Sequence, residues 1–124
     1  MITGVVEVRE ARVELQVHGP EGRNQRLNAV IDTVYTASLS LPPAVISSLG
    51  LRWQSIGRGI LADGSECLFD VFEAEVDWDD ERTRVLVDEA DTDPLIGMAL
   101  LSGFELNIQI RPRGQVNIRK LLEP

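Results

Sequence analysis

The stretch that decides the fold is Ala29-Val30-Ile31-Asp32-Thr33-Val34. Small or β-branched apolar residues that favour a buried strand lead directly into a carboxylate and a hydroxyl. A carboxylate at the end of a buried run is poorly solvated, so it needs water or hydrogen-bond donors around it. Two such carboxylates in contact share one proton, because like charges in contact cannot both ionise. A symmetric pair of Asp32 side chains therefore supplies a general acid and a general base in one site.

Two later segments extend this pattern. They are Ala37-Ser38-Leu39-Ser40-Leu41-Pro42 and Pro94-Leu95-Ile96-Gly97-Met98-Ala99-Leu100-Leu101. Together with the Asp32 stretch they resemble the retropepsin-like aspartic proteases, especially the small single-lobe bacterial members, over nearly the whole chain. The resemblance implies that Asp32 and Thr33 are catalytic residues, with Thr33 locking two copies of the loop across a dimer axis. An aspartate and a threonine that merely end a strand are the alternative interpretation.

Val34 departs from the family motif, which has glycine after Asp-Thr. Glycine accepts a positive φ and a close approach of another backbone, and a β-branched residue accepts neither comfortably. Either the loop keeps a conformation open to valine, or the substrate path beside Asp32 is narrowed. The backbone N–H of Val34 is retained and can still face the carboxylates.

Asp63-Gly64, between two apolar runs, is the strongest short-range hairpin signal in the sequence. By position this hairpin resembles the family's flap, a mobile hairpin that closes over bound peptide. The resemblance implies a substrate-binding set of Val34, Ala62, Asp63, Gly64, Ile96 and Gly97. Gly57 and Gly59 are expected to give the hairpin freedom. The pattern G-x-G-x-x-A at 57–62 ends at this turn and opens no helix, so a phosphate-binding loop is not expected.

Alternating apolar residues at short spacing predict an all-β fold. The resemblance implies a closed, retropepsin-like β-barrel with a flap hairpin and one short helix. We expect that helix over 43–49, and one or two helical turns over 98–102. A slip in the alternation near Arg9-Glu10 predicts a bulge or bend, giving two short strands or one bent strand over 4–17. Trp53 and Trp78 are expected to pack in the core, and Cys67 is expected to be buried or in an interface.

With 124 residues the chain is expected to form one domain over 1–124, too short for two lobes. A single active-site motif then implies a homodimer, in which the two-fold axis supplies the second Asp32. The net charge of −8, from 20 acidic and 12 basic residues, argues against a nucleic-acid partner.

No run of 18 apolar residues and no signal-peptide pattern is visible, so no membrane association and a cytoplasmic location are expected. Cys67 is the single cysteine, which excludes an internal disulfide. Asp88, Asp91 and Asp93 lack the glycine and terminal glutamate of a calcium loop, so we expect a solvated acidic loop. No metal and no cofactor are predicted.

The leading hypothesis is a dimeric aspartic endopeptidase acting on a peptide or protein substrate. Val34 keeps a second hypothesis open, a dimer of the same fold that binds extended peptides by strand addition without cutting them. A third hypothesis is a structural subunit in which the Asp32 pair has lost its function.

Overall fold

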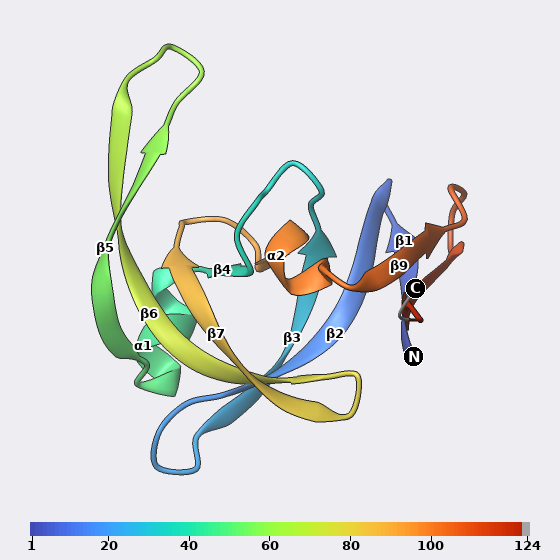
Figure 1. Cartoon of the computed structure of the whole chain (residues 1–124), viewed down its shortest axis with the longest axis horizontal. Helices are drawn as coiled ribbons and strands as arrows, with labels where there is room; N and C mark the ends of the chain where they lie inside the picture. The colour runs from blue at the N-terminus through green and yellow to red at the C-terminus, as the bar shows by residue number, and fades with distance from the viewer. Residues whose placement is uncertain (123–124) are drawn as a thin grey trace.

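The computed structural model describes residues 1–122, which form a ten-stranded mixed sheet and two short helices (Figure 1). The strands are β1 (Ile2–Glu7), β2 (Glu10–His18), β3 (Asn24–Ile31), β4 (Leu39–Leu41), β5 (Arg52–Ile60), β6 (Glu66–Trp78), β7 (Glu81–Glu89), β8 (Leu95–Ile96), β9 (Phe104–Ile108) and β10 (Gln115–Lys120). The helices are α1 (Pro43–Leu49) and α2 (Met98–Leu101). The order across the sheet is β5-β6-β7-β4-β8-β3-β2-β1-β10-β9.

The chain begins with two hairpins that carry it to Asp32. Val8 and Arg9, both at positive φ (49° and 62°), form the tight turn between β1 and β2. The predicted outcome of two short strands is therefore confirmed, and the slip in the pattern is a tight turn between them where a bulge or bend was expected. The second hairpin pairs β2 with β3 in register from His18↔Asn24 to Arg12↔Val30 and confirms the predicted delivery of Asp32.

Two parallel pairings in the middle of the sheet bring distant segments together. Strand β3 pairs with β8 through Ile31↔Ile96, and β4 pairs with β7 through Leu39↔Val87. The mostly-β prediction is confirmed. The helix expected over 43–49 is α1, and the helical turns expected over 98–102 form α2, so the described residues contain two short helices where the fold-class prediction had one. Each parallel pair needs a long crossover, so the alternating pattern of single strands does not reveal it.

The core lies on one face of these strands. It contains mainly Val, Leu and Ile side chains, including Val13, Leu15, Val17, Leu27, Ala29, Ile31, Leu39, Leu41, Val76, Val87, Ile96 and Ile118. Trp78 packs edge-on against Phe104, with ring centroids 5.9 Å apart, as expected for a core tryptophan. Trp53 is 57% exposed, so its predicted burial was wrong. Cys67 is exposed within one chain, so it is not a core residue, and its place in an interface stays a prediction.

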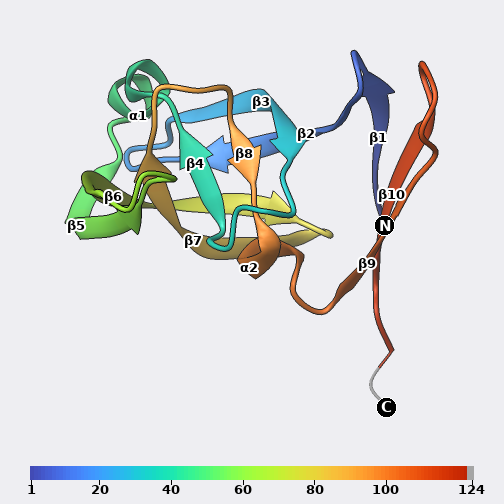
Figure 2. The same ribbon diagram turned by 90° about the horizontal axis from the view of Figure 1, so that it is seen from above.

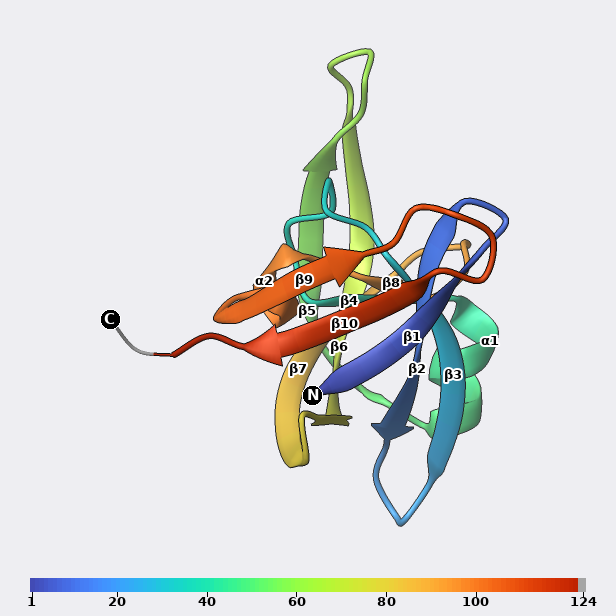
Figure 3. The same cartoon turned by 90° about the vertical axis from the view of Figure 1, so that its right-hand side faces the viewer.

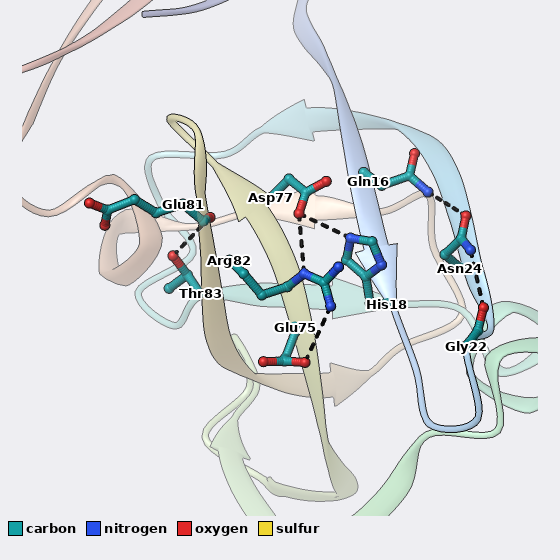
Figure 4. A network of polar contacts seen from close by, with 9 residues as sticks. All are labelled: Gln16, His18, Gly22, Asn24, Glu75, Asp77, Glu81, Arg82 and Thr83. Carbon is teal, nitrogen blue, oxygen red and sulfur yellow. Dashed lines mark hydrogen bonds and ion pairs between the residues drawn. The ribbon is translucent and has the colours of Figure 1, made fainter.

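The sheet folds back on itself where β2 also pairs with β6 through Val17↔Val76. Beside this junction the His18 Nε2 atom lies 3.0 Å from Asp77 Oδ1, and Arg82 reaches Asp77 and Glu75 at 3.5 and 3.6 Å (Figure 4). These groups are partly exposed, so each ion pair contributes little to stability. They lie at the end of β3 away from Asp32 and belong to the scaffold.

Two parts of the sheet extend beyond the core. The β5–β6 hairpin rises alone from the body (Figures 1 and 3). Strands β1, β10 and β9 form a separate layer to one side (Figure 2), in which β9 is the edge strand. Neither helix among residues 1–122 is long and apolar enough to cross a membrane.

Candidate active site

The loop after β3 folds around the carboxylate of Asp32. The backbone N–H groups of Val34 and Tyr35 donate to Asp32 Oδ1 at 3.0 and 3.3 Å. The Tyr35 N–H also lies 3.2 Å from the Asp32 carbonyl oxygen, which closes a tight turn. Val34 is absent from the positive-φ residues, so the loop has a conformation open to valine. Its side chain is 87% exposed and leaves its N–H directed at the carboxylate.

Strand β8 and the start of α2 hold this loop from the other side. The Asp32 N–H donates to the Ile96 carbonyl at 2.9 Å, and the Gly97 N–H donates to the Ser38 carbonyl at 3.0 Å. A Cβ atom on Gly97 would lie 2.2 Å from the Ala37 oxygen and 2.6 Å from the Tyr35 ring. Glycine is therefore required here because the two segments are in direct backbone contact. Ile96 and Gly97 are buried supports of the Asp32 loop.

Tyr35 ties the loop to β7. Its hydroxyl donates to Asp88 Oδ2 at 2.6 Å and lies 3.1 Å from the Leu39 carbonyl. Its carbonyl accepts the Met98 N–H at 2.8 Å. Burial, and then the hydrogen bond to Asp88 and its negative charge, raise the pKa of Tyr35 far above the ordinary value of 10.0. The phenol thus stays protonated and acts as a donor.

A strip of five residues lies on the face of the sheet opposite the core. The members are cross-strand neighbours, so their side chains share one face: Val30, Leu95, Ser40, Asp88 and Val71. We call this set the outer strip. Asp32 follows Ile31 of the core, so strand alternation places its carboxylate on the same face as the outer strip.

The outer strip continues onto the β5–β6 hairpin. Phe69 is two residues from Val71 on β6 and pairs with Gly57 on β5. A Cβ on Gly57 would lie 2.2 Å from the Phe69 ring, so that ring covers the glycine. The hairpin that the sequence predicts is confirmed. On its Phe69 face, the Phe69 ring of β6 packs against Gly57 of β5.

Ala62, Asp63 and Gly64 form the tip of this hairpin, away from Asp32 within one chain (Figure 1). Asp63 accepts hydrogen bonds from the Ser65 hydroxyl at 2.6 Å and the Ser65 N–H at 2.9 Å, which lower the pKa of Asp63. Thr33 is exposed, and its hydroxyl makes no hydrogen bond to other residues in the described range. The structure thus gathers Asp32, Thr33, Val34, Ile96 and Gly97 and leaves the tip residues apart.

The fold has a counterpart among solved structures. EIAV protease, complexed with the inhibitor HBY-793, superposes on 76% of this chain and 86% of its own, with a TM-score of 0.53 and 17% identity. The chain has the retropepsin fold. No family model and no curated protein matches the sequence. At this identity the likeness establishes the fold alone.

Within the retropepsin fold, sequence reasoning missed two residues at the site. Tyr35 is the single tyrosine and stands three residues after Asp32, but a loop tyrosine gives no pattern signal. Asp88 was assigned to a solvated acidic loop, and this was wrong, because it is half-buried at the end of β7 and accepts the Tyr35 hydroxyl. No group of three or more His, Cys, Asp or Glu side chains within residues 1–122 is arranged to hold a metal ion.

Proposed function

We propose that this chain is a homodimeric aspartic endopeptidase that acts on peptide or protein substrates in the cytoplasm. The observation that carries the proposal is Asp32 on a retropepsin fold, with its carboxylate bound by two backbone N–H groups and its loop held by β8. The pairing of β2 with β6 supports the closed barrel that the proposal includes.

In the proposed reaction the two Asp32 carboxyls of a dimer share one proton. The ionised carboxylate takes a proton from a water molecule, whose oxygen attacks the peptide carbonyl carbon. The protonated carboxyl gives its proton to the carbonyl oxygen. The tetrahedral diol then collapses, the C–N bond breaks, and the leaving amine takes a proton. The exposed hydroxyl of Thr33 is available for a bond across the dimer axis.

The test is cleavage of unfolded casein and of a peptide library between acidic and neutral pH. We expect cleavage by the unaltered protein and a loss of at least about a thousandfold in Asp32→Asn. The control is Asp91→Asn, which makes the same chemical change at an exposed position outside the site. Absence of cleavage in folded, dimeric protein would contradict the proposal.

A second candidate function is a dimer that binds extended peptides without cutting them. The exposed Val34 side chain favours it, because valine occupies space beside Asp32 that glycine would leave open. Val34→Gly separates the two functions. If the unaltered protein binds a statine peptide without cleaving substrates and Val34→Gly gains cleavage, the chain is a binding module derived from a protease.

A further inference from the structure

Asp88 is a half-buried carboxylate that has no cationic partner among residues 1–122. Only the Tyr35 hydroxyl bonds to it, through Oδ2, and Oδ1 accepts no hydrogen bond from the described part of the chain. Two other acids of the sheet have cationic partners: Asp93 reaches Arg12 at 3.4 Å, and Asp77, at the opposite end of the β6–β7 pair, reaches His18 and Arg82. A partly desolvated carboxylate without a cation is costly, so Asp88 needs a further reason to be placed here.

Ser40 provides a second, independent sign of incomplete bonding at this place. Ser40 is the cross-strand neighbour of Asp88 in the β4–β7 register. It is 2% exposed, and its Oγ has no hydrogen-bond partner in the described residues. Buried hydroxyl groups are normally satisfied. Two adjacent polar groups on the outer strip, the Asp88 Oδ1 acceptor and the Ser40 hydroxyl, thus have no hydrogen-bond partner in the described residues.

The position of this pair connects it to the candidate active site. Tyr35 contacts Asp32 through its backbone and Asp88 through its hydroxyl. Asp88 and Val71 are direct neighbours, and the Phe69 side of the β5–β6 hairpin continues from Val71. Within the outer strip Leu95 and Asp88 are partly exposed, whereas Val30, Ser40 and Val71 are buried. An extended peptide lying between Asp32 and this hairpin would therefore meet the strip at Leu95 and Asp88.

We infer that Asp88 is a specificity-determining residue that receives a lysine or arginine side chain of the substrate next to the scissile bond. This inference rests on the proposed function and deepens it. The substrate cation donates to Asp88 Oδ1, while the Tyr35 hydroxyl holds Oδ2 and fixes the carboxylate.

The test uses statine-containing peptides in matched pairs, lysine against norleucine and arginine against citrulline, at each position flanking the statine. Binding is measured by fluorescence polarisation at pH 7. At one position we expect the unaltered protein to bind the charged peptide about tenfold to a hundredfold more tightly than its neutral match, the range of a charge-assisted hydrogen bond. In Asp88→Asn, which keeps the shape and the bond from Tyr35, the preference should disappear.

Two matched variants complete the design. Asp91→Asn removes the same charge from the exposed loop and should keep the preference. Tyr35→Phe removes the bond that fixes Asp88 Oδ2 but keeps the carboxylate, so it should reduce the preference without abolishing it. Equal binding of charged and neutral peptides, a preference unchanged in Asp88→Asn, a loss shared by Asp91→Asn, or no binding of any peptide would overturn the inference. Charge-selective binding without any cleavage would support the inference and overturn the endopeptidase proposal.

Discussion

Tyr35 links three parts of the site through a single residue. Its N–H binds Asp32, its carbonyl binds the start of α2, and its hydroxyl binds Asp88. The Tyr35 ring also occupies the space that a Cβ atom on Gly97 would need. The shape of the Asp32 loop therefore depends on one partly buried phenol as well as on the motif residues.

Replacing Tyr35 by phenylalanine should lower the free energy of unfolding by about 1–3 kcal/mol at neutral pH, because a hydrogen bond to a carboxylate is lost. The pKa of Tyr35 is raised in the folded state above its ordinary value of 10.0. A raised pKa gives stability that is complete below about pH 10 and is lost at higher pH, since only the unfolded chain then releases the proton. The difference between the two proteins should therefore shrink above pH 10.

Urea unfolding at pH 8, 9, 10 and 11 measures this difference. Tyr35 is the single tyrosine, so no other tyrosine contributes to the change of stability with pH. A stability difference that stays constant or grows across this range would show that the phenol is not protected from ionisation in the fold.

At the scale of elements, the β5–β6 hairpin extends away from the core, and its two strands pack against each other through Phe69. Its tip carries no contact to the Asp32 loop within one chain, and apolar side chains on it are exposed, including Ile56, Ile60 and Leu68. Phe69, on the opposite face from Leu68, covers Gly57 and stiffens the arm.

Removing the Phe69 ring should loosen the arm without unfolding the core. In Phe69→Ala we expect amide exchange over 55–69 to accelerate about fivefold, corresponding to a loss of about 1 kcal/mol of local packing. Exchange in β2 and β3 should be unchanged. Leu68→Ala is the matched control, because that side chain is 62% exposed on the other face. Equal acceleration in both variants would show that Phe69 has no special role.

At the scale of the whole molecule, one chain presents half of the proposed catalytic machinery. In the proposed dimer, a second chain would contact Asp32, the exposed Thr33 and the edge strand β9. A two-fold axis supplies an identical surface, which makes an isologous homodimer the simplest way to complete the site.

Subunit mixing tests this dependence on a second chain. A fixed amount of unaltered protein is unfolded and refolded together with an equal amount of Asp32→Asn protein. Cleavage should fall to about half of that of the unaltered protein refolded by itself, because half of the unaltered chains then pair with an inactive partner. Refolding with an unrelated protein should leave cleavage unchanged. Activity that is insensitive to the added variant would indicate that one chain acts alone.

The sequence by itself determined the local parts of this protein. Period-two alternation and turn residues identified the hairpin that delivers Asp32, the Asp63-Gly64 hairpin and the helix over 43–49, because these features depend on neighbours in the chain. The family resemblance, resting on three short segments, indicated the fold.

The tertiary structure alone decided which distant segments meet. The parallel pairs Ile31↔Ile96 and Leu39↔Val87 and the bond from Tyr35 to Asp88 join residues far apart in the sequence. The conformation of Val34 and the burial of Asp88 were also open until the chain was packed. The physical reason is that strand alternation fixes which side chains share a face, but the order of strands across a sheet depends on long-range packing.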